Sequence, residues 1–302
     1  MMSVINENLT SLTTEMPNEK TKDLDLMTPI EFVRVMNSEN QNVFHGVEKV
    51  LPEVARVIEL TSERMKRGGR VFYAGAGTSG RIGLMDAVEC VPTFGVSDDV
   101  FIGLIAGGER AFVKAVEGAE DSLTLCADDL KARNFCKDDV LIGLAASGRT
   151  PYVIGGIEYA NSIGALTVAV ACNCGSKIGD VAQIKIEVDA GSEVLTGSTR
   201  LKAGTAQKII LNMISTGVMI QLGKVYGNLM VDVLTTNEKL VDRARRIVMR
   251  VTGVDYETAD KTLTATGNKV KPALVMLLNK CSYDEALTML NKNAGFIRRT
   301  FA

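Results

Sequence analysis

The stretch "RVFYAGAGTSGRIGLMDAVEC" (residues 70–90) decides the fold of this sequence. Residues 70–75 are typical of a short apolar strand, and residues 80–90 are typical of a helix that follows at once. Between them, "GAGTSG" has the spacing G-x-G-x-x-G, in which glycines let the backbone approach a phosphate at the start of a helix. This spacing alone fits a dinucleotide cofactor or another phosphate compound, so it predicts phosphate binding without naming the ligand.

The same alternation of strand and helix recurs along the chain. Apolar runs that we predict as strands lie at 70–75, 100–108, 139–148, 165–173 and 182–191. Strands that are apolar throughout and are separated by helices indicate a parallel sheet covered on both faces. With right-handed crossovers, the sequence predicts an α/β fold with a three-layer, doubly wound, five-stranded parallel sheet.

Helical segments flank the predicted sheet in the sequence. Residues 29–67 look helical in two pieces, the segments 28–40 and 42–69 with their caps, and Pro52 kinks or divides the second piece. A long apolar helix is expected over about 203–222. After that helix the strand pattern stops, and short helices capped by Asp255 and Ser282 follow. We therefore expect three parts: an N-terminal helical segment (1–60), an α/β domain (61–224) and a small C-terminal helical region (225–302).

The composition argues against several classes of protein. Hydrophobic residues make up 46% of the 302 residues, and 34 basic residues nearly balance 36 acidic ones, which gives no charge argument for nucleic acid or a membrane surface. The six cysteines show no C-x-x-C spacing and have no histidine nearby, so we expect reduced thiols and no metal site. The N-terminus lacks a signal-peptide pattern, and residues 209–223 are too short and too polar to span a membrane, so we expect a cytoplasmic protein.

The loops that follow the strands are the candidate sites, because ligands of open parallel sheets bind beyond the carboxyl ends of the strands. In the first loop, Gly77 and Gly80 allow close approach of a phosphate, and Thr78 and Ser79 add hydroxyl donors. The second strand ends without the acidic residue that a ribose requires, since Glu109 comes slightly late. This favours a compact phosphate monoester over a dinucleotide; the alternative for the loop is a tight structural turn.

A second loop, "ASGRT" (146–150), follows the third predicted strand and repeats this chemistry. It offers the side chains of Ser147, Arg149 and Thr150, followed by a proline that can begin a helix. Two such loops on neighbouring strand ends can converge on one anion, which is more specific than either loop alone. The alternative for Arg149 is a surface ion pair.

A third polar turn, "TGSTRLKAGTAQK" (196–208), opens the long apolar helix. Ser198, Thr199 and Lys202 could bring hydroxyl groups and positive charge to the same pocket. The alternative is an ordinary capped helix start with solvated basic residues.

Acid–base chemistry in this sequence falls to residues other than histidine. The single histidine, His45, lies far from the loops in the sequence, so no Ser-His-Asp arrangement can be built around them. Glu89, in "DAVECVPT", has apolar neighbours and a helix carbonyl end close by, which favour the protonated form that a general acid needs. Glu120, in "AVEGAED", is a second candidate. Considered alone, each glutamate is more often a solvated helix residue.

Several long blocks, in order along the chain, carry a resemblance to a known family. They read "GAGTSGRIGLMDAVEC", "GLIAGG", "AVEGAED", "AASGRTPYVI", "TGSTRLKAGTAQK", "LNMISTG" and "NLMVDV". Together these blocks resemble the N-acetylmuramic acid 6-phosphate etherases, over essentially the whole chain. The core resembles the sugar isomerase (SIS) domain, which is also found in the related glucokinase regulatory protein. The resemblance implies that residues 61–224 form an SIS-like domain that holds a sugar phosphate.

The resemblance also implies a reaction: cleavage of the ether between C3 of the sugar and D-lactate, without metal or nicotinamide. After the ring opens, one glutamate removes the C2 proton, another protonates the departing lactate oxygen, and water adds to the conjugated aldehyde. Carried onto this sequence, Glu120 takes the role of the base and Glu89 that of the acid. Two positions depart from the expected pattern, Val91 in "ECVPT" and Ser192 in "GSEVLTG", both beside the site.

Two other functions share this fold and stay open at this point. One is a non-catalytic sugar-phosphate-binding regulator, and the other is an aldose–ketose sugar-phosphate isomerase, which shares proton removal at C2. The family resemblance implies a homodimer. Four apolar residues of the long helix fit either subunit pairing or an ordinary core: Met213, Ile214, Val218 and Met219.

Overall fold

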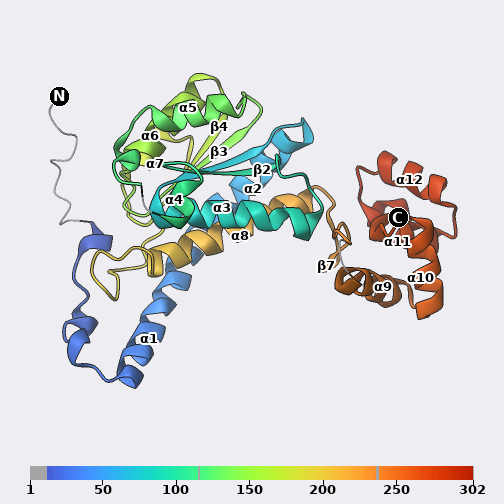
Figure 1. Ribbon diagram of the computed structural model, residues 1–302, viewed down its shortest axis with the longest axis horizontal. Coiled ribbons are helices and arrows are strands. Elements are labelled where there is room, and N and C mark those ends of the chain that lie inside the picture. The colour runs from blue at the N-terminus through green and yellow to red at the C-terminus, as the bar shows by residue number, and fades with distance from the viewer. Residues whose placement is uncertain (1–11, 115, 236–237, 302) are drawn as a thin grey trace. The chain divides into compact units, whose positions relative to one another are not determined.

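The computed structural model describes residues 12–114, 116–235 and 238–301 of the chain (Figure 1). The chain divides into two compact units, which we describe separately. The first unit comprises Met1–Ala87 and Asp99–Ile214, and the second comprises Val88–Asp98 and Ser215–Ala302. Two long helices, α3 (Gly77–Phe94) and α8 (Lys202–Gln221), contribute residues to both units.

The first unit is built on a five-stranded parallel sheet with the strand order β2-β1-β3-β4-β5. Its strands are β1 (Val71–Gly75), β2 (Phe101–Ile105), β3 (Val140–Ala145), β4 (Leu166–Ala171) and β5 (Ile184–Glu187). Each strand lies inside one of the predicted apolar runs, and all residues of β3 and β4 are buried, as a sheet covered on both faces requires. The predicted doubly wound α/β fold is therefore confirmed. Most strands are shorter than the runs, because the last apolar residues of those runs already belong to the loops.

Strand β1 occupies the position from which the chain turns both ways. Val71 lies opposite Phe101 of β2 on one side and opposite Val140 of β3 on the other. The connection after β1 therefore leads to one neighbour, and the connection after β2 returns to the opposite neighbour. This makes the gap between the ends of β1 and β3 the topological switch point of the sheet, where open α/β sheets bind ligands.

Helices cover both faces of the sheet (Figure 1). On one face pack α5 (Leu125–Ala132), α6 (Pro151–Ser162) and α7 (Lys177–Val181), whose apolar side chains join those of the strands in one buried core. On the opposite face lie α3 and α8, side by side, with α2 (Leu51–Lys66) against β5. The approach is close on both faces: a Cβ on Gly83 of α3 would lie 2.8 Å from the Cβ of Tyr73, and one on Gly143 of β3 would lie 2.6 Å from Val153 of α6.

The N-terminal part of the first unit begins with three short 3-10 turns, Thr13–Glu15, Glu19–Thr21 and Leu24–Leu26. Helix α1 (Pro29–Glu48) follows and starts with a capping box, in which the side chains of Thr28 and Glu31 each bond the other's backbone. The predicted break near residue 41 is wrong, because α1 continues through it to Glu48. The predicted division at Pro52 is confirmed, because α2 starts with Pro52 in its first turn. In the sequence between β2 and β3 lie α4 (Arg110–Val113) and the 3-10 turn Ala119–Asp121.

The second unit is mainly helical and has its own core. Its helices are α9 (Glu238–Thr252), α10 (Tyr256–Ala265), α11 (Val270–Asn279) and α12 (Tyr283–Lys292), followed by the 3-10 turn Ile297–Thr300. The predicted caps are confirmed, because Asp255 accepts a bond from the Thr258 amide and Ser282 forms a capping box with Glu285. One pair of strands was not predicted: β6 (Val225–Tyr226) and β7 (Leu229–Met230) pair antiparallel. Two residues are too few to produce a recognisable alternation.

Two helical glycines allow a matched test of the packing under the first loop. Gly83→Ala should destabilise the protein by about 1–3 kcal/mol, because the new methyl group would meet the rigid Cβ of Tyr73. Gly204→Ala in α8 should leave stability unchanged or raise it by up to about 1 kcal/mol, because its nearest neighbours lie at ordinary contact distances of 3.4–3.6 Å. Urea-induced unfolding measures the stability of both variants. Equal unfolding midpoints would show that α3 does not pack as closely on Tyr73 as the structure indicates.

Candidate functional site

The first loop connects β1 directly to α3 and requires its glycines. Gly77 has a φ of 52°, in the left-handed region. A Cβ on Gly80 would lie 2.7 Å from the carbonyl oxygen of Gly75, and a Cβ on Gly75 would lie 2.7 Å from the amide nitrogen of Gly80. The two ends of the G-x-G-x-x-G motif therefore touch through their backbones, which presents the first amides of an 18-residue helix at the switch point.

The hydroxyl-bearing residues of this loop face α8. The Ser79 hydroxyl, on a residue that is only 7% exposed, donates to Oε1 of Gln207 at 2.9 Å. Thr78 is half-buried, and its Cγ2 lies 3.5 Å from where a Cβ on Gly204 would stand. Two turns further along α3, Asp86 accepts hydrogen bonds from Asn212 of α8 at 2.6 Å and from the Tyr73 hydroxyl at 2.8 Å. Polar contacts thus set the register between the two helices.

The second loop leaves the same edge of the sheet, because β3 is the neighbour of β1. Ser147 accepts a hydrogen bond from the Arg149 amide at 3.3 Å, and both side chains are half-buried. Gly148 has a φ of 73°, and a Cβ there would lie 2.3 Å from the Cβ of Ser176. Thr150 precedes Pro151 at the start of α6, and its side chain makes no capping bond. The structure thus brings the first two loops to one edge, as the sequence analysis expected.

The third turn holds its backbone by local bonds, from the Ser198 amide to Leu195 and from the Thr199 amide to Gly197. Ser198 and Thr199 are half-buried. The start of α8 is capped by Glu193, a buried residue whose two carboxylate oxygens accept from the amides of Lys202 and Ala203, each at 2.9 Å. This cap fixes the direction in which the polar turn enters the helix.

Lys202 lies in an ion pair that the sequence analysis did not foresee. Its side chain is 1% exposed, and Nζ lies 3.1 Å from Oε2 of Glu39 on α1, whose side chain is 4% exposed. Glu39 also accepts from Lys20 and Asn18, each at 2.8 Å. Burial favours a higher pKa for Glu39, but the bonds from Lys20, Asn18 and Lys202 outweigh it and hold the pKa at about 2. The role of Lys202 toward a phosphate stays a prediction.

The two candidate acid–base residues are both exposed. Glu89 lies in α3, after the residues of that helix that belong to the first unit. Glu120 lies in the 3-10 turn Ala119–Asp121, directly after Gly118, whose left-handed conformation redirects the chain. The two glutamates belong to different compact units. Of the four apolar residues singled out on α8, Ile214, Val218 and Met219 are fully buried and Met213 is 38% exposed, so three of them are core residues.

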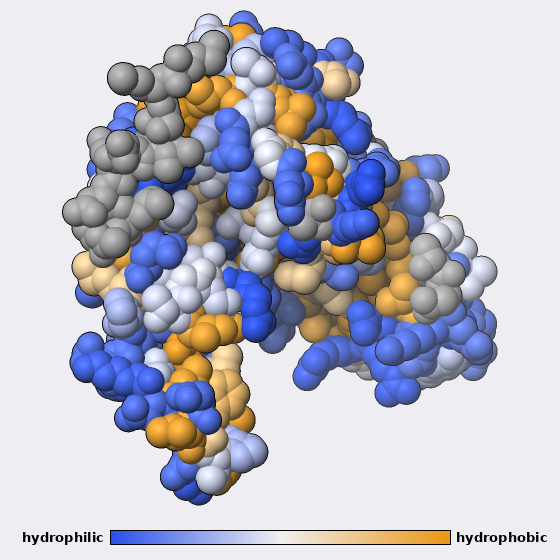
Figure 2. Space-filling model, turned by 60° about the vertical axis from the view of Figure 1, so that its left-hand side comes forward, coloured by the Kyte–Doolittle hydropathy of each residue, from blue (hydrophilic) through white to orange (hydrophobic). Residues whose placement is uncertain are grey.

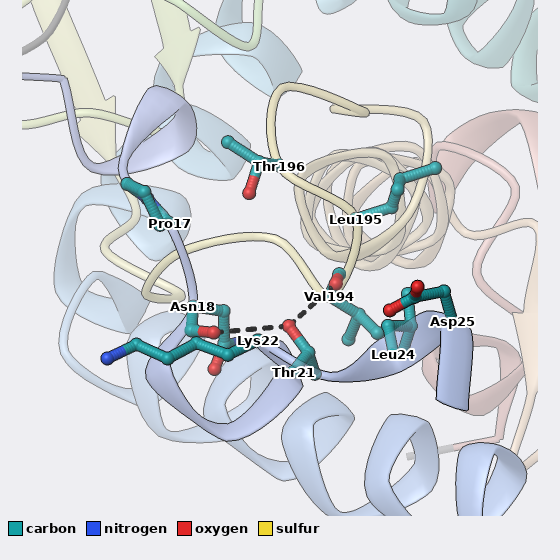
Figure 3. Close-up of a pocket in the computed structure, with 9 residues that line it drawn as sticks. All are labelled: Pro17, Asn18, Thr21, Lys22, Leu24, Asp25, Val194, Leu195 and Thr196. Atoms are coloured by element: carbon teal, nitrogen blue, oxygen red, sulfur yellow. Dashed lines mark hydrogen bonds between the residues drawn. The ribbon is translucent and has the colours of Figure 1, made fainter. Parts of the chain in front are cut away.

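A cavity of about 550 Å³ lies next to the third turn (Figure 3). One wall comes from the segment 17–25 and the other from the segment 194–196, and the Thr21 hydroxyl joins them by donating to the carbonyl of Val194 at 2.8 Å. Its lining includes none of the predicted site residues, although Thr196 stands two positions before Ser198. Sequence reasoning missed this wall, because the turns of the segment 17–25 carry no motif of their own.

The described residues include neither a cluster that could hold a metal ion nor a helix that could span a membrane. Among them, no group of three or more His, Cys, Asp or Glu side chains is placed to hold a metal ion. None of the described helices is both long and apolar enough to cross a membrane. The six cysteines are free thiols, and burial raises the pKa of Cys126 and of Cys172 to about 12.

The comparisons with known proteins first define the class. Residues 53–161 match the family model described as the glucokinase regulatory protein N-terminal SIS domain. A phosphoheptose isomerase from Francisella tularensis has a TM-score of 0.50 at 16% identity, covering 64% of this chain and 98% of that one. A putative phosphosugar isomerase from Bacteroides fragilis has a TM-score of 0.50 at 19% identity, covering 64% and 91%. The fold is therefore that of an SIS domain.

The sequence relatives then define the family. An N-acetylmuramic acid 6-phosphate etherase of Clostridium beijerinckii is 55% identical over 97% of this chain and 96% of its own length. The etherases of Halalkalibacterium halodurans and Mycolicibacterium smegmatis are 55% and 54% identical, each over 96% of this chain and 98% of theirs. The chain belongs to the N-acetylmuramic acid 6-phosphate etherase family.

The Glu39–Lys202 pair can be tested through stability. Glu39→Gln should cost about 3–5 kcal/mol, because it leaves the buried Lys202 ammonium without its carboxylate. The double variant Glu39→Gln/Lys202→Met should be more stable than the single variant, because it leaves no unpaired buried charge. Denaturant unfolding measures both. A double variant less stable than Glu39→Gln would show that the pair does not act as a unit.

The same variant predicts a change in pH dependence. Because folding lowers the pKa of Glu39 from 4.5 to about 2, its contribution to stability is complete above pH 4.5 and is lost as the pH falls toward 2. Glu39→Gln should therefore lose less stability than the wild type over this range. Glu48→Gln, an exposed change on the same helix, should keep the wild-type slope.

Proposed function

We propose that this protein cleaves the lactyl ether of N-acetylmuramic acid 6-phosphate, giving N-acetylglucosamine 6-phosphate and D-lactate. The observation that carries this proposal is the family membership: relatives named for this activity are 55% identical over nearly the whole chain. The glycine-lined loop at the switch point supports it, because such a helix start binds phosphate. The simplest test is to incubate the protein with N-acetylmuramic acid 6-phosphate and to assay D-lactate.

The phosphate of the substrate would lie against the first two loops. Gly77, Gly80 and the helix amides would face its oxygens, with Thr78 and Ser79 adding hydroxyl groups. Arg149 carries a positive charge on the neighbouring strand end. Ser147, Thr150, Ser198, Thr199 and Lys202 are the remaining residues that we assign to this subsite or to its support.

The reaction requires one base and one acid. We assign Glu120 to remove the C2 proton of the open-chain aldehyde, whose acidity comes from the neighbouring carbonyl group. Loss of the C3 oxygen as lactate then needs a proton, which we assign to Glu89, and water adds to the resulting unsaturated aldehyde at C3. The exposure of both glutamates leaves their carboxyl groups accessible to a substrate. No metal or organic cofactor enters this scheme.

The glutamate roles predict large and separable losses of activity. Glu120→Gln and Glu89→Gln should each lower kcat for D-lactate release by about 10²–10⁴-fold, the contribution of a positioned acid or base. Glu117→Gln, an exposed neighbour of Glu120, should keep kcat within about twofold of wild type.

Deuterium exchange distinguishes the two roles. In D₂O, the Glu89→Gln variant should still exchange the C2 proton of the substrate while releasing little lactate, because its base is intact. The Glu120→Gln variant should lose both. If instead Glu120→Gln still exchanges the C2 proton and Glu89→Gln does not, the roles of acid and base must be exchanged. Formation of a ketose phosphate by the wild type would favour an isomerase.

We also propose that the protein is a homodimer. Helix α1 supports this assembly, because Ile30, Val33 and Phe44 are 54%, 50% and 61% exposed, and Leu26, just before the helix, is 79% exposed. Figure 2 shows hydrophobic residues exposed on the protruding lower part of the molecule, and the exposed fractions place these four residues on or just before α1. An exposed apolar surface of this kind is typical of an interface.

Charge placed on this surface should separate the subunits. The variant Ile30→Glu/Val33→Glu should sediment as a monomer where the wild type sediments as a dimer, because ionised carboxylates would have to be buried in the interface. Arg56→Glu changes an exposed residue of α2 and alters the net charge by the same amount, so it serves as the control for added negative charge. A wild type that sediments as a monomer at micromolar concentration would refute the assembly.

A further inference from the structure

Gln207 carries an unusual hydrogen-bond arrangement under the first loop. The residue is fully buried on α8, and its Oε1 accepts from the Ser79 hydroxyl at 2.9 Å. Among the described residues, Nε2 of the same amide has no hydrogen-bond partner, although it is buried. Buried amide donors are almost always paired, so an unpaired one beside a candidate ligand site calls for an explanation.

The arrangement also restricts what Ser79 can do. A serine hydroxyl has a single hydrogen, and here that hydrogen points to Gln207. While it does so, the side chain of Ser79 can offer a phosphate only lone pairs, which an ionised phosphate oxygen, itself an acceptor, cannot use. Ser79 becomes a phosphate donor only when another group takes over the bond to Gln207.

We propose that Gln207 is a positioning residue that reverses its hydrogen bond with Ser79 when a sugar phosphate binds. The amide turns over so that Nε2 donates a hydrogen bond to Ser79 Oγ, and the Ser79 hydroxyl donates its own hydrogen bond to a phosphate oxygen instead. No group changes its protonation state, and every hydrogen stays on its own residue. This inference rests on the proposed function, because it requires a phosphate at the first loop.

The exchange improves the hydrogen bonding of both residues. The unpaired N–H of Gln207 gains an acceptor, and the carbonyl oxygen left behind is the group that proteins more readily leave under-satisfied. Ser79 exchanges a neutral acceptor for a charged one, and charge-assisted bonds are roughly twice as strong as neutral ones.

The surroundings hold the amide in place for this exchange. Gly204 lies against Thr78 on one side of Gln207, and Asn212 donates to Asp86 at 2.6 Å on the other. The Asn212 amide nitrogen has an acceptor, which Gln207 lacks, although both lie between the same two helices. The unpaired donor is thus specific to the position beneath the loop.

The variant Gln207→Glu gives the sharpest test. A protonated glutamic acid can donate to Ser79 Oγ as the turned amide does, but a carboxylate only accepts and keeps the Ser79 hydrogen. The ratio of its KM to the wild-type KM for N-acetylmuramic acid 6-phosphate should therefore rise by about tenfold or more between about pH 5.5 and 8.5, with little change in the kcat ratio. A ratio that stays flat with pH would overturn the proposal.

Two controls separate this mechanism from simpler effects. Gln207→Met has a similar length and neither a strong donor nor a strong acceptor, so the ratio of its KM to the wild-type KM should not change with pH. Ser79→Ala/Gln207→Glu lacks the hydroxyl hydrogen, so the rise with pH should nearly disappear. If the rise persists in this double variant, charge repulsion alone explains it and the proposal fails. Thermal unfolding of each variant checks that it folds. If Gln207→Glu does not fold, the test becomes Ser79→Ala, which removes the donor to phosphate and must raise KM more than Gln207→Met does.

Binding measurements distinguish this inference from the proposed function. Calorimetry with N-acetylglucosamine 6-phosphate against N-acetylglucosamine reports the phosphate contact without turnover. If the wild type neither releases lactate from N-acetylmuramic acid 6-phosphate nor binds N-acetylglucosamine 6-phosphate, the proposed function fails. If the wild type does both and the Gln207→Glu ratio stays flat, only the role of Gln207 fails.

Discussion

The pairing of β1 between β2 and β3 is the constraint on which the rest of the first unit depends. Because the chain turns to one side after β1 and to the other side after β2, the ends of β1 and β3 form the topological switch point, the place where open α/β sheets bind ligands. The backbone contact between Gly75 and Gly80 then fixes where α3 begins. Sheet order and two glycines therefore decide where a phosphate can meet helix amides, before any polar side chain takes part.

The position of the start of α8 depends on a second interaction, between charged groups that lie far from the first loop in the sequence. Glu193 caps the first amides of α8, and the Lys202–Glu39 pair joins its first turn to α1. These bonds fix where α8 starts and thus which of its residues meets Ser79. Through Glu39, the N-terminal segment consequently supports the start of α8, and α8 supports the first loop through the bond between Gln207 and Ser79.

Features governed by local rules could be predicted from the sequence, and features governed by long-range pairing could not. The strands, the break before Pro52 and the caps at Asp255 and Ser282 follow from apolar runs and capping chemistry over a few residues. The motif blocks also predicted the family. The ion pair of Lys202 could not be predicted, because its partner Glu39 lies 163 residues away. Gln207 carried no signal at all, because only the packing of α8 on α3 reveals its unpaired donor.

The fold alone explains phosphate binding better than it explains the reaction. A phosphoheptose isomerase and a protein described as a putative phosphosugar isomerase share this fold at 16% and 19% identity, whereas an etherase relative is 55% identical in sequence. The loops of the sheet can hold a sugar phosphate for either chemistry, and a fold does not determine a function. What differs must be the placement of the acid and the base around C2 and C3. In this chain the two glutamates that we propose for these roles lie outside the sheet, on a 3-10 turn and on the later part of α3. An elimination can therefore evolve on an isomerase scaffold by changing these peripheral segments while the phosphate site stays in place.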